Sequence, residues 1–66
     1  MIDISRLAEV RKAKGLSQEK LAKLSGVHRV TIARYESGKC LPNIRTLERL
    51  SDALKVNLGE LVEKVG

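Results

Sequence analysis

Aromatic residues are almost absent from this chain of 66 residues, which has no tryptophan, no phenylalanine and one tyrosine, Tyr35. A folded core must therefore be built from aliphatic side chains. The single cysteine cannot form an intramolecular disulfide, and there is no signal peptide, so we expect a cytoplasmic protein. No apolar stretch approaches the roughly 18 residues that span a bilayer, which argues against a membrane protein.

Groups for catalysis and metal binding are equally scarce. One histidine and one cysteine are too few for a recognisable metal-ligand set, and neither has a catalytic partner in the sequence. No glycine-rich loop of the phosphate-binding type is present. The sequence therefore predicts a protein that is not an enzyme and has no metal or cofactor.

The composition is that of a folded globule. Hydrophobic residues make up 42% of the chain and charged residues 32%. The chain, residues 1–66, is long enough for one domain, near the lower size limit for unaided folding. No segment shows the alternating pattern of a strand, so we expect an all-α fold.

Capping signals define three helices in the first part of the chain. Asp3 can cap the first helix, and Gly15 fits the left-handed position at its end. Ser17 caps the second helix. The third helix runs over about residues 29–37 and ends at Gly38.

Two further helices complete the expected bundle. Asn43 caps the fourth helix, just after Pro42, and a capping-box pattern over residues 57–60 begins a short fifth helix. The residues of the fourth helix expected to face inward are Ile44, Leu47, Leu50, Ala53 and Leu54.

Residues 18–32 have the spacing of two helices that cross at close range. Ala22 lies where a larger side chain would push the helices apart, and Gly26 lies in the turn, where φ is positive and a Cβ is penalised. A helix, a short glycine turn and a second helix form the helix-turn-helix unit, which presents its second helix to the major groove of DNA. Helical hairpins without a DNA function show parts of the same pattern.

Basic charge is concentrated around this unit. Between Arg11 and Arg45, nine lysines and arginines accompany two glutamates, a net charge of +7, whereas the flanks together carry four basic and six acidic residues, a net charge of −2. A field of one sign attracts a polyanion. A solubilising surface is the alternative. Because the basic charge coincides with the helix-turn-helix, binding to nucleic acid is favoured.

The chain resembles the Cro/CI-type (XRE) family of bacterial and phage helix-turn-helix regulators over nearly its whole length. The matching positions are Arg11, 14–18, 21–22, 25–27, 31–32, 34–39, Pro42, 46–47, Leu50, 53–54, Leu58 and Leu61. The resemblance implies a compact five-helix, lambda-repressor-like domain whose second and third helices form the helix-turn-helix. It also implies a transcriptional regulator, most simply a repressor, that binds double-stranded operator DNA.

The third helix is the expected recognition helix. Ile32, Tyr35 and Glu36 face inward at i, i+3 and i+4. The residues left facing outward are Arg29, Val30, Ala33 and Arg34. The positions that match the family's base contacts are His28, Arg29, Val30 and Arg34. Arginine can bridge O6 and N7 of guanine with two donors, and valine can contact a thymine methyl. The alternatives are a phosphate contact or a free surface charge for either arginine, and simple exposure for the histidine.

Four polar residues are expected to contact DNA phosphates around that helix. Gln18 lies at a helix N-terminus, which favours an anion, and by resemblance it is the family's phosphate-clamping glutamine. Lys39, Asn43 and Arg45 follow the recognition helix and could line the adjoining backbone. The alternatives are an exposed first-turn residue for Gln18 and solvated charges for Lys39 and Arg45.

By resemblance, Arg11 and Glu36 pair across the first and third helices and orient the recognition helix from behind; a phosphate contact by Arg11 is the alternative.

Three positions depart from the family pattern. His28 replaces the usual serine or threonine cap, so capping should be weaker. Lys55 stands where glycine or asparagine often ends the fourth helix, at a cost of roughly 1 kcal/mol if the left-handed conformation is kept. Cys40 and Leu41 replace a loop position that is often basic in relatives, which should weaken the phosphate clamp there. A redox switch at Cys40 is the alternative role, but the chain has no second cysteine to resolve an oxidised form.

An apolar stripe near the C-terminus bears on assembly. Leu58, Leu61, Val62 and Val65 follow the spacing i, i+3, i+4 and i+7. We expect Leu58 and Leu61 to close the core, and Val62 and Val65 to form the interface of a homodimer with recognition helices about 34 Å apart, matching a palindromic operator. A tail helix packed wholly on its own domain is the alternative.

Two other kinds of binding module compete with a DNA-binding regulator. One is a protein-interaction unit, such as an antitoxin, although the outward Arg29 and Arg34 argue against that as the only role. The other is RNA binding, but side chains cannot read the deep, narrow major groove of A-form RNA. Control by concentration or by a protein partner is the preferred hypothesis for regulation.

Overall fold

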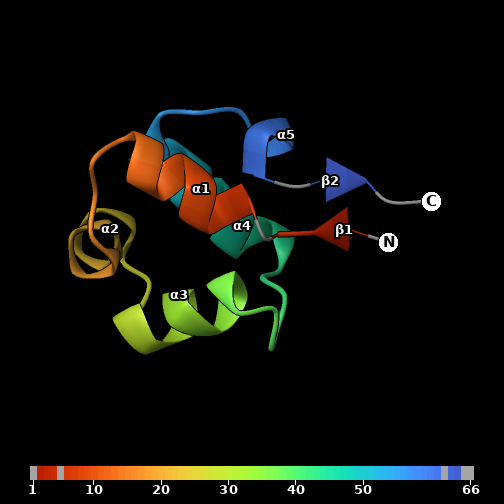
Figure 1. Ribbon diagram of the computed structural model, residues 1–66, viewed down its shortest axis with the longest axis horizontal. Coiled ribbons are helices and arrows are strands. Elements are labelled where there is room, and N and C mark those ends of the chain that lie inside the picture. Colours follow the sequence, from red (N-terminus) through yellow and green to blue (C-terminus); the bar gives the residue numbers. More distant parts are fainter. Residues whose placement is uncertain (1, 5, 62, 65–66) are drawn as a thin grey trace.

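The computed structural model describes residues 2–4, 6–61 and 63–64. Its elements in chain order are β1 (Ile2–Asp3), α1 (Arg6–Ala13), α2 (Gln18–Ser25), α3 (Arg29–Glu36), α4 (Ile44–Leu54), α5 (Leu58–Leu61) and β2 (Glu63–Lys64). Figure 1 shows the helices gathered around one centre, with α3 at the lower edge and the strand pair projecting to one side. The expected all-α fold of five helices is confirmed.

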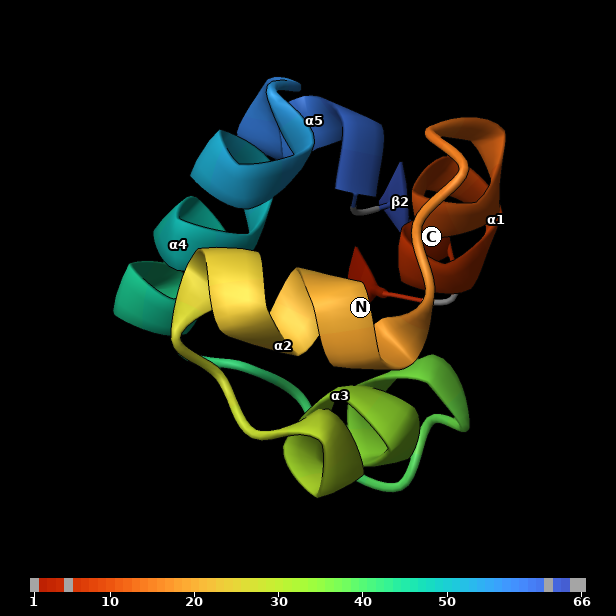
Figure 2. The same ribbon diagram turned by 90° about the vertical axis from the view of Figure 1, so that its left-hand side faces the viewer.

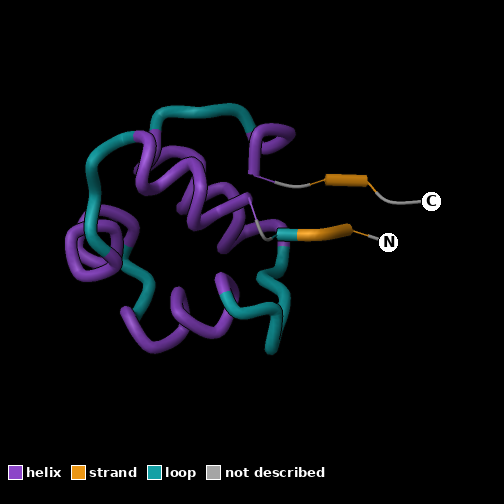
Figure 3. Tube along the Cα trace, viewed as in Figure 1, coloured by secondary structure: helices purple, strands orange, loops and turns teal. Residues whose placement is uncertain are grey.

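Helix contacts place α3 at the edge of this arrangement. α2 packs against both α3 and α4, and α1 packs against α3 and α5. Turned by 90°, the molecule shows α2 lying above α3 (Figure 2). Short loops join most of the helices, and the segment between α3 and α4 is the longest of them, residues 37–43 (Figure 3). The helix-turn-helix therefore has one face on the bundle and one face toward solvent.

A strand pair near the ends of the chain was not predicted. β1 and β2 are antiparallel, with Ile2 opposite Lys64 and Asp3 opposite Glu63. The prediction that Asp3 caps the first helix is wrong, because its backbone belongs to β1 and α1 begins only at Arg6. Strands of two residues are too short for an alternating pattern to reveal them.

Side-chain caps begin α2 and α4 as predicted. The Ser17 hydroxyl accepts a hydrogen bond from the backbone N–H of Lys20 at 3.0 Å, and the Asn43 side-chain oxygen accepts one from the N–H of Thr46 at 2.8 Å. At α5, the Glu60 carboxylate accepts a hydrogen bond from the backbone N–H of Asn57 at 3.0 Å, as a capping box requires. Each bond satisfies a backbone donor that the first turn of a helix leaves free.

The core is aliphatic apart from one tyrosine. The buried hydrophobic residues are Ile4, Leu7, Leu21, Ile32, Tyr35, Leu47, Leu50, Leu54 and Leu61. The prediction that Ile44 faces inward is wrong, since this side chain is 65% exposed. It is the first residue of α4, and the packed part of that helix begins only at Leu47. None of the helices that the structure describes is long and apolar enough to cross a bilayer.

Lys55 ends α4 in the left-handed conformation, with φ 57°, and among the described residues it is the only non-glycine residue with positive φ. The backbone of Lys55, which replaces the usual glycine or asparagine at this position, is therefore strained. We expect Lys55→Gly to raise the free energy of unfolding by about 0.5–1 kcal/mol, because glycine removes the Cβ clash but has a more flexible unfolded chain. Urea denaturation checks this. Lys55→Ala is the control, since it keeps the Cβ, and equal stability of the two variants would contradict the strain.

Candidate nucleic-acid interface

α2 and α3 form the predicted helix-turn-helix, connected by residues 26–28. Gly26 takes φ 76° and donates its N–H to the carbonyl of Ala22 at 2.9 Å. The hydroxyl of buried Ser25 donates to a carbonyl one turn earlier at 2.7 Å and accepts from the N–H of Val27 at 3.2 Å. These bonds fix the turn, so the direction of α3 relative to α2 is set by the protein itself.

The two sides of α3 have different surroundings. Ile32 and Tyr35 are buried in the core, as predicted. On the opposite side, Arg29, Val30 and Arg34 are exposed, as predicted, while Ala33, also expected to face outward, is half-buried. Val30 is 59% exposed. The outward side of α3 therefore presents the guanidinium donors of two arginines, which suit hydrogen-bond acceptors, and the apolar side chain of Val30, which suits a methyl group. Both kinds of group occur on the base edges of DNA.

The beginning of α3 is open to solvent. His28 occupies the N-cap position, is exposed, and makes no capping side-chain hydrogen bond within the described part of the chain. The weaker capping predicted from the sequence is confirmed. A shallow hollow of about 290 Å³ adjoins this position and is lined by Ala22, Lys23, Gly26, Val27, His28 and Arg29. The first N–H groups of α3 and two nearby cations make this end of the helix favourable for an anion.

The segment after α3 and the first turn of α4 carry three of the residues expected to contact phosphates. Lys39, Asn43 and Arg45 are all exposed. The oxygen of the Asn43 side chain is used in capping α4, which leaves its amide nitrogen without a hydrogen bond to any residue that the structure describes. Together with the N-terminus of α4, these side chains form a polar and mostly basic edge that follows α3 in the chain.

An ion pair holds the end of α3 against α1. Glu36 accepts from Arg11 Nε at 2.7 Å and from Arg11 Nη2 at 3.2 Å, and the two side chains are 8% and 9% exposed. The remaining Nη1 of Arg11 donates to the carbonyl of Leu16 at 2.7 Å. The pair predicted between these helices is present. Its geometry is that of a two-donor contact, which fixes orientation as well as distance.

Gln18 makes a contact that was not predicted. Its Nε2 donates to Glu36 Oε1 at 2.9 Å, and the residue is half-buried rather than freely exposed. The first residue of α2 and the last residue of α3 are thereby joined through the same carboxylate that pairs with Arg11. Each of the three N-terminal helices contributes one side chain to this cluster.

The C-terminal predictions are only partly covered by the structure. Leu61 is fully buried and Leu58 is half-buried, as expected for residues that close the core. Val62 and Val65, the predicted dimer contacts, lie outside the described residues. Cys40 is half-buried and packs against the core.

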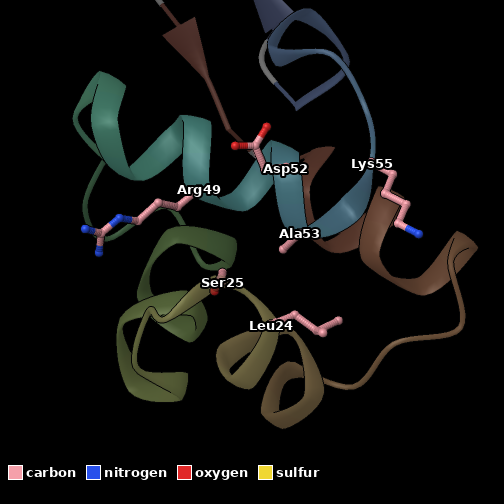
Figure 4. Close-up of a pocket in the computed structure, with 6 residues that line it drawn as sticks. All are labelled: Leu24, Ser25, Arg49, Asp52, Ala53 and Lys55. Atoms are coloured by element: carbon pink, nitrogen blue, oxygen red, sulfur yellow. The ribbon is translucent and has the colours of Figure 1, made fainter.

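A second hollow lies between the end of α2 and α4. Its volume is about 410 Å³, and its lining residues are Leu24, Ser25, Arg49, Asp52, Ala53 and Lys55 (Figure 4). The Arg49 and Lys55 side chains extend in opposite directions rather than toward a common point. Among the described residues, no three His, Cys, Asp or Glu side chains are grouped so that they could hold a metal ion.

Comparison with known proteins gives a consistent result. Residues 7–61 match the HTH_3 helix-turn-helix family. The cryptic phage CTXphi transcriptional repressor RstR of Vibrio cholerae is 38% identical over 56 residues, which are 85% of this chain and 50% of RstR. The transcriptional activator BcrR of Enterococcus faecalis is 39% identical over 57 residues, which are 86% of this chain but 28% of BcrR. The chain thus spans half the length of RstR, and a smaller share of BcrR.

One solved structure is similar to this chain over most of the length of both proteins. The crystal structure of the restriction-modification controller protein C.AhdI from Aeromonas hydrophila is similar with a TM-score of 0.82 and 43% sequence identity. The similarity covers 85% of this chain and 85% of the controller protein.

Proposed function

Because the chain belongs to the HTH_3 family of helix-turn-helix DNA-binding transcriptional regulators, we propose that it binds a palindromic operator as a homodimer and acts as a repressor. The observation that carries the proposal is the outward side of α3, where Arg29, Val30 and Arg34 are exposed while the other side is buried in the core. The matched relatives are transcriptional regulators rather than enzymes.

Base recognition in this proposal belongs to α3. The helix enters the major groove, and Arg29 and Arg34 each present two donors to a guanine, with His28 at the entrance of the groove. Val30 contacts a thymine methyl. A good bidentate pair contributes about 1–3 kcal/mol of discrimination against the wrong base. The half-site should therefore contain G·C pairs, with an A·T pair at the position that Val30 contacts.

Backbone contacts hold α3 in register. In this proposal Gln18 at the start of α2, together with the edge formed by Lys39, Asn43 and Arg45, binds the phosphates that border the groove. Helix N-termini add their free N–H groups and dipoles to these side chains. Such contacts position the protein but carry no sequence information.

Two copies related by a two-fold axis would place their recognition helices about 34 Å apart, one turn of DNA. We assign the contact between them to the segment that contains Val62 and Val65. A bound dimer would act in the cytoplasm by obstructing RNA polymerase. Obstruction needs no surface beyond the DNA-bound dimer, which makes repression the simpler proposal. Control would come from the concentration of the chain or from a protein partner.

Selection from a pool of randomised duplexes at several salt concentrations tests the proposal. We expect a palindromic motif with half-sites one turn apart, and an affinity that falls steeply with salt because counterions are released. Lys39→Ala should reduce the slope of log affinity against log salt by about 0.9 for each protomer, or about 2 for a dimer.

Lys12→Ala is the matched control, because it removes the same charge from an exposed position on α1. It should leave the slope nearly unchanged. If no motif is enriched at any salt concentration, sequence-specific binding by this chain alone is wrong.

A further inference from the structure

The carboxylate of Glu36 accepts hydrogen bonds from two other helices at once. Arg11 of α1 donates through Nε and Nη2, and Gln18 of α2 donates through Nε2 at 2.9 Å. Glu36 itself is the last residue of α3 and Gln18 is the first residue of α2. One side chain therefore ties together the two outer ends of the helix-turn-helix.

This contact determines which way the Gln18 amide is turned. The oxygen of an amide can only accept hydrogen bonds, so beside a carboxylate only the nitrogen can face Glu36. That nitrogen carries two N–H groups, and Glu36 uses one of them. The second has no acceptor among the residues that the structure describes, and the half-buried Gln18 is still reached by solvent.

The position of this unused donor suits an anion. It lies in the first turn of α2, where backbone N–H groups and the helix dipole attract negative charge. A carboxylate nearby would normally repel a phosphate, but Glu36 is already paired with the guanidinium of Arg11 at 2.7 Å. The Gln18 amide can therefore donate to both Glu36 and a phosphate, because the negative charge of Glu36 is compensated by Arg11.

We propose that Glu36 is a positioning residue for DNA binding: it holds the Gln18 amide so that the second N–H points to a backbone phosphate. The phosphate itself rests on the proposed function. Glu36 then acts on DNA without touching it, and the Gln18 side chain is ordered when the chain folds rather than when it binds. This role is additional to the ion pair between Glu36 and Arg11.

A double-mutant cycle tests the positioning. The variants are Gln18→Ala, Glu36→Asp and their combination, and the readout is the Kd for a duplex of random sequence at low salt, where phosphate contacts dominate. Aspartate keeps a negative charge opposite Arg11 but is shorter by one methylene, so it withdraws from Gln18. Each single change should weaken binding roughly five- to tenfold, and the combination no more than Gln18→Ala alone.

Lys39 provides the matched control for the cycle. Lys39→Ala removes a different phosphate contact, so its effect should multiply with that of Glu36→Asp. If Glu36→Asp distorts α3 in general, its effect on Kd should instead multiply both with that of Gln18→Ala and with that of Lys39→Ala. Multiplying effects of Gln18→Ala and Glu36→Asp in a chain that binds DNA would overturn the positioning role.

A measurement without DNA separates this inference from the proposed function. Gln18 is the only glutamine in the chain, so its side-chain amide can be assigned directly by ¹⁵N NMR. In the free protein the amide hydrogen that faces Glu36 should exchange more slowly than that of a free glutamine, and Glu36→Asp should abolish the difference. A wild type in which neither amide hydrogen of Gln18 is protected would overturn the positioning.

Two further outcomes have distinct meanings. Wild-type chain that binds no duplex would overturn the proposed function, and with it the phosphate contact. If Glu36→Asp does not fold, Gln18→Glu replaces it in the test. Gln18→Glu leaves Arg11 and Glu36 intact but places a second carboxylate beside both the Glu36 carboxylate and the phosphate. Gln18→Glu should then weaken duplex binding more than Gln18→Ala, and equal or tighter binding would overturn the inference.

Discussion

Replacing Arg11 by methionine should lower the free energy of unfolding by about 3–5 kcal/mol, a large share of the total for a small domain. The substitution leaves the Glu36 carboxylate almost fully buried without its counter-charge, and it removes the donor to the Leu16 carbonyl. Methionine keeps most of the apolar length of the side chain, so the loss reflects the charge rather than a cavity. Urea denaturation followed by circular dichroism measures the change.

The double variant Arg11→Met/Glu36→Leu is the control for this prediction. Replacing a buried ion pair by apolar side chains is often neutral, so much of the stability should return. A single variant as stable as the wild type would show that the pair does not hold α3. Intact stability with a reduced salt dependence of DNA binding would favour the alternative in which Arg11 contacts a phosphate.

Arg34→Ala should weaken binding to the selected operator by about 1–3 kcal/mol for each half-site and relax the preference at one base pair in each. Arg34 is exposed on α3, so its loss leaves the core unchanged. Alanine is also a good helix former, and the fold should be preserved. Repeating the selection with the variant shows which position of the motif becomes degenerate.

Arg45→Ala is the matched control, because Arg45 is an exposed arginine that the proposal assigns to a phosphate. It should weaken binding to all sequences by a similar factor and leave the motif unchanged. If Arg34→Ala behaves in the same way, Arg34 contacts the backbone instead of a base.

Local signals predicted much of the fold. Ser17, Gly26 and Asn43 act through bonds to residues within four positions, so a short stretch of sequence contains the whole interaction. The errors concern features that depend on distant parts of the chain. Asp3 pairs with Glu63 instead of capping a helix, and Ile44 begins α4 before the part of that helix that packs against the rest of the bundle.

The candidate site shows the same division. The outward side of α3 follows from helical periodicity, and the exposed positions of Arg29 and Arg34 were predicted from it. The hydrogen bond between Gln18 and Glu36 joins residues on two helices, and no periodic pattern within either helix indicates it. The bridging hydroxyl of Ser25 was visible only as a position that matches the family, because its role depends on the three-dimensional turn.

The separation of the two sides of α3 also bears on how such a protein can change over generations. The residues that hold this helix, Ile32 and Tyr35 together with Glu36, share no position with the exposed Arg29, Val30 and Arg34. Mutations on the exposed side can therefore accumulate without a loss of folding stability. A duplicated copy of the chain could acquire a new target through a few such changes, while its scaffold stays under the same selection.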